Sequence, residues 1–323
     1  MNNKKQGGFS NWCKTYTGQK YITSVLFLLI PVILLVVFTF IPALEIIPYS
    51  FQERGQLTLA KDVKFVGLDN YKEIFTNPDY LVTFKNSLYY LVGSFIQQII
   101  ALLMASILCS KIRAKGLFKG IVFFPYLMNG VAVSIIFLQF FRKGQGTMIP
   151  QGSFNTILSW FGIDPVLWLS DMHNQAKANW CLVFVSVWRY IGYDILMYIG
   201  AIQSISPDLY EAADLDGANP WQRFRYIVFP SIKPIISLQL ILAVKGAISV
   251  FEIPYIMTNG KNGTSTFVMA TMDVMFKKDF VGLASAMAVV LLIIVIVVTI
   301  IQKAVFSESN DKPRRKKRGG ARG

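Results

Sequence analysis

The segment 206–234, with the sequence SPDLYEAADLDGANPWQRFRYIVFPSIKP, is a polar stretch between two apolar segments that are long enough to cross a membrane. Ser206, Pro207 and Asp208 predict the start of a helix. A hydroxyl side chain caps free backbone N–H groups, proline fits the first helical position, and an acidic residue interacts favourably with the positive end of the helix dipole. We expect this helix to run to about Leu215.

The same segment predicts a turn and a second helix. Asp216 and Gly217 are expected to end the first helix, because glycine permits backbone conformations that a side chain hinders. Asn219 and Pro220 predict the start of the second helix, and Pro230 predicts its end. The expected product is a rigid helical hairpin between two membrane spans, in a position suited to contact with a soluble partner.

The chain as a whole is more apolar than an ordinary soluble domain. Its 323 residues are 54% hydrophobic and 15% charged. Six apolar runs approach the length of about twenty residues with which a helix crosses the hydrocarbon core, and they lack the alternation of barrel strands. The expected fold is an all-α membrane protein with six transmembrane helices and a cytoplasmic hairpin between spans four and five. The expected spans are residues 21–49, 84–108, 120–141, 179–203, 232–257 and 281–301.

Basic residues indicate the orientation of these spans. Lys and Arg are concentrated in both tails and in the hairpin, and the positive-inside rule places such segments in the cytoplasm. We expect a basic cytoplasmic tail at 1–20, a six-span domain at 21–306 that includes the hairpin at 206–234, and a basic cytoplasmic tail at 307–323. The final run of basic residues is expected to contact anionic membrane lipid and not nucleic acid.

Several kinds of chemistry are not expected from this sequence. Cys13, Cys109 and Cys181 fall in a cytoplasmic tail or in membrane spans, so an external disulfide framework is not expected. His173 is the single histidine, which argues against a histidine metal site or a Ser-His-Asp triad. No GxxxxGK[ST] phosphate-binding loop occurs, so nucleotide chemistry would belong to a separate subunit. We therefore expect a non-catalytic chain without a cofactor or metal.

Four ionisable residues lie at membrane depth, where charges are costly and usually face a protein interior or a water-filled path. They are Arg189 and Asp194 in the fourth span and Lys245 and Glu252 in the fifth. The seven-residue spacing of the second pair places both residues on one face of a continuous helix. Two interpretations remain open: the charges pair with one another or with a companion subunit, or they line a translocation path.

The hairpin resembles the cytoplasmic coupling loop of permease subunits in ATP-binding-cassette (ABC) importers. Phe229 departs from the pattern, because the family usually carries Leu there. Four further stretches extend the resemblance to the carbohydrate type of permease, the first of two such subunits in oligosaccharide importers: 64–75, 84–95, 201–218, and 254–260 together with 279–290. The residues that carry the loop pattern are Glu211, Ala212, Ala213, Gly217, Ile227, Phe229 and Pro230.

The resemblance implies a multi-pass subunit of a bacterial or archaeal cell membrane with several partners. These would be a second permease in a heterodimer, two ATPase subunits that bind the ATP, an extracytoplasmic solute-binding protein, membrane lipid and a sugar or oligosaccharide. Alternating access driven by ATP is the implied mechanism. The residues expected to contact the ATPase are Glu211, Ala212, Ala213, Asp216 and Gly217.

The resemblance also implies a substrate path, and we add Glu252 to it because of its charge at membrane depth. The expected residues of this path are Gly192, Ile195, Lys245, Gly246, Ser249 and Glu252. Lys245 departs from the family, which more often carries an uncharged residue there. An anionic solute, such as a uronate oligosaccharide or a glycerol phosphate, is therefore an alternative substrate on the same scaffold. A secondary transporter that uses the four ionisable residues as an ion relay is the competing class.

Overall fold

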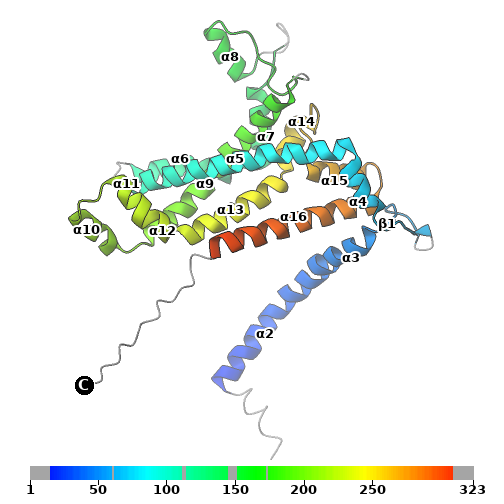
Figure 1. Cartoon of the computed structure of the whole chain (residues 1–323), viewed down its shortest axis with the longest axis horizontal. Coiled ribbons are helices and arrows are strands. Elements are labelled where there is room, and N and C mark those ends of the chain that lie inside the picture. The colour runs from blue at the N-terminus through cyan, green and yellow to red at the C-terminus, as the bar shows by residue number, and fades with distance from the viewer. Residues whose placement is uncertain (1–14, 60–61, 111–113, 145–150, 172–173, 308–323) are drawn as a thin grey trace, which may run out of the picture. The chain divides into compact units, whose positions relative to one another are not determined.

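The computed structural model describes a chain that is nearly all helical (Figure 1). Its contacts divide the chain into two compact units, residues 1–71 with 279–289 and residues 72–278 with 290–323. The expected tails lie largely outside the described residues, as do Cys13 and His173. The described ranges are 15–59, 62–110, 114–144, 151–171 and 174–307.

The first unit contains the N-terminal membrane helix. Helix α2 (Tyr16–Leu35) continues through a π-helical turn, η1 (Val36–Phe40), into α3 (Ile41–Tyr49). Together they form one apolar segment of 34 residues, which contains the expected first span and starts earlier, at Tyr16. Strands β1 (Gln52–Glu53) and β2 (Lys64–Phe65) then form a short antiparallel pair.

The second unit is a helical bundle. Helix α4 (Asp69–Thr76) leads into it, and α5 (Pro78–Cys109), α9 (Gln175–Gln203) and α13 (Lys233–Ile248) pack side by side (Figure 1). The other helices are α6 (Lys115–Leu127), α7 (Gly130–Phe140), α8 (Ser153–Trp160), α14 (Glu252–Thr258) and α15 (Phe267–Phe276). Helix α16 (Val281–Ser307) begins in the first unit and ends in the second.

Within the described residues, five apolar segments are long enough to span a membrane, and α6 and α7 count as a sixth if the pair, bent by 96° at its junction, is one span. The expected continuous third span at 120–141 is therefore wrong in its geometry. Pro125 lies near the end of α6, and Asn129 caps α7 by accepting a 2.8 Å hydrogen bond from the Val131 N–H. The apolar run continues through this junction, but the helix does not.

The fifth expected span is also interrupted. Helix α13 ends at Ile248 and α14 begins at Glu252. Val250 lies between the two helices, and its carbonyl accepts a 2.8 Å hydrogen bond from the Thr266 hydroxyl. The expectation that Lys245 and Glu252 share one helical face is wrong, because it assumed an unbroken helix.

The bundle contains two apolar clusters, one toward each end of α5 and α9. The first includes Tyr90, Leu182 and Ile253, and the second includes Ala105 and Ile199. Between them along α5, α9 and α13 lies a layer of buried polar side chains, formed by Gln97, Gln98, Asp194 and Gln239. Buried polar groups in a membrane domain are costly unless they are paired, so this layer is a candidate functional element.

Candidate functional site

A cavity of about 610 Å³, here called the central cavity, lies in the second unit and is lined by α5, α9, the end of α6 and the α13–α14 junction. Its wall is mainly apolar and aromatic, with a few hydrogen-bonding side chains, which is the usual composition of a small-molecule site. The polar and charged lining residues are Ser94, Gln97, Gln98, Ser186, Asp194, Ser249 and Glu252.

Aromatic rings form one side of the central cavity. Tyr126 stacks on Tyr193 with ring centroids 5.1 Å apart and meets Tyr190 edge-on at 6.3 Å. Tyr90 also lines the cavity, and its buried hydroxyl has no hydrogen-bond partner among the described residues. Trp188 instead packs against Phe137 and is not a lining residue. The cavity therefore offers both ring faces and hydroxyl groups to a bound molecule.

Asp194 is held by three glutamine side chains, here called the glutamine cage. Gln97 and Gln98 donate to its Oδ2 atom at 2.6 and 2.8 Å. Gln239 donates to Oδ1 at 2.8 Å, and Tyr198 donates to the Gln98 carbonyl oxygen at 2.6 Å. The cage joins α5, α9 and α13 around a carboxylate that is only 6% exposed. Its hydrogen bonds compensate for the water that the carboxylate loses.

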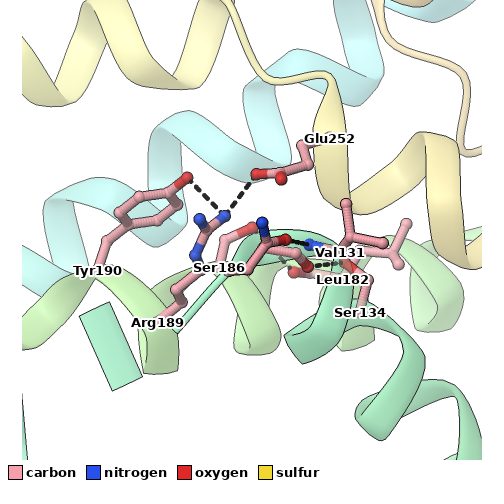
Figure 2. A network of polar contacts seen from close by, with 9 residues as sticks. Val131, Ser134, Leu182, Ser186, Arg189, Tyr190 and Glu252 are labelled. Carbon is pink, nitrogen blue, oxygen red and sulfur yellow. Dashed lines mark hydrogen bonds and ion pairs between the residues drawn. The ribbon is translucent and has the colours of Figure 1, made fainter. Parts of the chain in front are cut away.

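Arg189 and Glu252 form a second polar contact at the cavity wall. Arg189 Nη1 lies 2.6 Å from Glu252 Oε2 and 3.0 Å from the Tyr190 hydroxyl oxygen, and Figure 2 shows the guanidinium between these two side chains. A methyl group built on Gly130, the first residue of α7, would overlap both members of the ion pair. Glycine at this position lets α7 approach the pair closely.

The structure separates the expected substrate-path residues into two groups. Gly246, Ser249 and Glu252 line the central cavity. Gly192 faces α6, where a β-carbon would overlap the Val122 carbonyl, and Ile195 is buried in the second apolar cluster.

Lys245 also lies away from the lining. It is exposed and forms no ion pair within the described part of the chain. The relay that the competing class requires is not assembled either, because Arg189 pairs with Glu252 while Asp194 contacts neutral amides.

Sequence reasoning missed the glutamine cage and the role of Gly130. Only ionisable groups at membrane depth were considered. Gln97, Gln98 and Gln239 also lie in apolar runs, and burial of a neutral amide in a membrane is costly, although less so than burial of a charge. A search for every polar side chain in the spans would have found the three glutamines. Gly130 gave no such signal, since its importance depends on residues far away in the sequence.

The hairpin lies at the end of the bundle opposite α14 and α15 (Figure 1). Its first helix, α10 (Pro207–Leu215), agrees with the expected bounds, and Ser206 caps it by accepting from the Asp208 N–H at 3.3 Å. Gly217 has φ +69°, a conformation that favours glycine. The expected turn at 216–217 is therefore observed.

The second helix of the hairpin starts as expected and ends later. Helix α11 (Pro220–Arg223) begins with a capping box between Asn219 and Gln222. Helical turns then continue through η3 (Phe224–Val228) and α12 (Phe229–Ser231), so the helix ends one residue after the expected end at Pro230. Pro230 supplies no backbone N–H close to this end of the helix.

An internal ion pair links the first helix of the hairpin to the second, while several side chains of the hairpin remain exposed. Arg223 pairs with Asp214 and donates to the Ala218 carbonyl at 2.9 Å. Ala213 is buried against the protein itself, and the side chain of Leu215 at the turn is 90% exposed. The exposed residues of the expected ATPase contact are Glu211, Ala212, Asp216 and Gly217.

Comparison with known proteins defines the class to which this fold belongs. Residues 82–308 match the family described as binding-protein-dependent transport system inner membrane component, and the chain belongs to this family. It is thus a multi-pass membrane permease, a transport component and not a catalytic one. A probable ABC transporter permease of Bacillus subtilis, YurN, is 32% identical over 279 residues, covering 84% of this chain and 91% of the relative.

Other comparisons agree with this assignment. The multiple sugar-binding transport system permease MsmF of Streptococcus mutans is 31% identical over 267 residues, covering 82% of this chain and 88% of the relative. Among solved structures, a bacterial ABC transporter that imports the acidic polysaccharide alginate aligns with a TM-score of 0.77 over 91% of this chain and 98% of that one. At 21% identity, this likeness supports the fold.

Proposed function

We propose that this permease forms half of the translocation path for a sugar or oligosaccharide in a binding-protein-dependent ABC importer. The central cavity carries this proposal, because tyrosine rings, serine hydroxyls and amide side chains surround a volume suited to a small hydroxylated molecule. Relatives support the same substrate class. An arabinooligosaccharide permease and a lactose permease are among them, at 32% and 30% identity.

The hairpin supports an ATP-driven mechanism. It connects the end of α9 to the start of α13, and both helices line the central cavity. A displacement of the hairpin by an attached ATPase would therefore move two cavity walls together. Cycles of ATP binding and hydrolysis in two separate ATPase subunits would open the cavity alternately to each side of the membrane.

The complete transporter would contain this chain, a second permease, two ATPase subunits and an extracytoplasmic solute-binding protein. Both termini and the hairpin would face the cytoplasm, in agreement with the distribution of Lys and Arg in the sequence. Exposed hairpin residues, including Glu211 and Leu215, would contact the ATPase. The solute-binding protein would deliver its sugar on the opposite side.

Transport in vesicles tests this function against an ion-coupled carrier. Vesicles that contain the whole complex are supplied with ATP, the binding protein and an uncoupler that collapses ion gradients. We expect sugar uptake to continue with ATP and to stop without it. Uptake that requires an ion gradient and ignores ATP would overturn the proposal.

A further inference from the structure

The charges that face the central cavity are unevenly compensated. Asp194 and Glu252 both line it, whereas none of the described residues that line it is Lys or Arg. The Glu252 carboxylate is neutralised by Arg189 at 2.6 Å. The partners of Asp194 are the neutral amides of the glutamine cage. The Asp194 carboxylate is therefore a negative charge at the cavity wall without a cationic partner among the described residues.

The hydrogen bonds of the glutamine cage stabilise the ionised form of Asp194. Both carboxylate oxygens accept from amide N–H groups. Three N–H donors stabilise a buried carboxylate without removing its net charge. Its field therefore extends into the cavity.

We propose that the glutamine cage makes the central cavity selective by charge, so that it admits neutral and cationic small molecules and disfavours anionic ones. For the substrate, this inference rests on the proposed sugar-import function and assigns an uncharged sugar in place of a uronate or a phosphorylated solute. A unit charge about 8 Å away, at an effective dielectric constant of about 20, changes the local concentration of a monovalent ion by roughly tenfold or more.

The position of Lys245 is consistent with this selectivity. Lys245 is the basic residue of the fifth span that suggested an anionic solute, but it is not a lining residue. Its neighbours Gly246 and Ser249 face the cavity, while the Lys245 side chain is exposed elsewhere. Lys245 therefore does not neutralise the field of Asp194 at the wall.

Thiol modification measures this field without knowledge of the transported sugar. Ser249, an exposed lining residue, is replaced by cysteine in the complete complex, in a background in which the native cysteines are serine. Modification rates are then measured with a cationic methanethiosulfonate, the trimethylammonium-ethyl reagent, and an anionic one, the sulfonatoethyl reagent. The cation-to-anion rate ratio, divided by that of a small free thiol, reports the local potential.

We expect the cation-to-anion rate ratio at Ser249→Cys to exceed that of the free thiol. The same ratio should fall by about tenfold or more when Asp194→Asn is added. The asparagine variant can retain the cage, because Gln239 Oε1 is buried without a partner among the described residues and can accept from the new amide. Lys245→Met is the matched control, since it removes an exposed charge outside the lining. It is expected to leave the ratio nearly unchanged.

Two results would overturn the inference: a ratio at or below that of the free thiol, or a large change in Lys245→Met with none in Asp194→Asn. If Asp194→Asn lowers the thermal stability of the complex, the sign of the potential is decided without that variant. The cation-to-anion rate ratio is then measured at Ser249→Cys and at Gly246→Cys with Asp194 in place. Because modification needs no transport, its outcome is independent of the uptake experiment. If the measured potential is negative but the complex takes up no sugar, only the proposed function is contradicted.

Discussion

Arg189 of α9 and Glu252, the first residue of α14, form an ion pair of 2.6 Å beside the first residue of α7. Both α7 and α14 begin immediately after an interruption in a membrane span. The pair therefore joins the start of α14 to the continuous helix α9 (Figure 2). Gly130, at the start of α7, leaves the space that the pair occupies. This junction defines the geometry of one side of the central cavity.

Removal of one charge should destabilise this junction. Glu252→Gln leaves the guanidinium of Arg189, whose side chain is only 12% exposed, without an ionic partner. We expect a loss of about 1–3 kcal/mol in stability, measured by thermal unfolding of the purified complex. Adding Arg189→Met should restore part of this loss, because no unpaired charge then remains.

The control for this prediction is an exposed ion pair in the same unit. Lys277 and Asp273 pair at 2.7 Å with side chains that are 58% and 44% exposed. Asp273→Asn should leave thermal stability unchanged, since water solvates both groups. Equal effects of Glu252→Gln and Asp273→Asn would show that the Arg189–Glu252 contact has no structural role.

Gly192 should tolerate no side chain, for reasons of packing. A β-carbon there would overlap the backbone of α6 at Val122 and Phe123, so Gly192→Ala should cost about 1–3 kcal/mol in thermal stability. A methyl group added at Gly200, on the same helix, would meet no described atom of a neighbouring element within 4 Å, and Gly200→Ala should be neutral. A Gly192→Ala complex that keeps full stability but loses sugar uptake would instead place Gly192 in the translocation path.

The orientation of the chain can be measured with reporter fusions. The positive-inside distribution predicts that the hairpin and the C-terminal tail are cytoplasmic. Fusions after Lys115, Gln222 and Asp311 should report a cytoplasmic location, and fusions after Lys64, Gln151 and Asn262 an external one. An external signal at Gln222 would remove the hairpin from the ATPase side and contradict the proposed mechanism.

The sequence predicted the helices well because apolar length and helix caps are local properties. The first hairpin helix was expected to end near Leu215 and does so, since Ser206, Pro207 and Gly217 determine its bounds within a few residues. The breaks in the third and fifth spans were not expected. Apolar composition continues through both, and the Val250 carbonyl is satisfied by Thr266, which is distant in the sequence.

The candidate site was predictable only in part for the same reason. Glu252 was expected to share a face with Lys245, but its partner is Arg189, which lies 63 positions away. The glutamine cage joins three helices and has no local pattern. Ionisable residues at membrane depth indicated where the polar layer lies, whereas their pairing depends on tertiary packing.

Charge reversal at Glu211 is the direct test of whether the hairpin couples this permease to ATP hydrolysis. Glu211 is exposed on α10, so the substitution should leave folding and membrane insertion intact while placing a charge of the wrong sign at the ATPase contact. The matched control is Asp62→Lys, a charge reversal at an exposed residue of a loop in the first unit.

The measurement is ATP-dependent sugar uptake, with substrate-stimulated ATP hydrolysis, in proteoliposomes that contain the complete complex. We expect Glu211→Lys to lower both activities by about tenfold or more, whereas Asp62→Lys should retain them. Wild-type uptake and ATP hydrolysis in a fully assembled Glu211→Lys complex would contradict this coupling role of the hairpin.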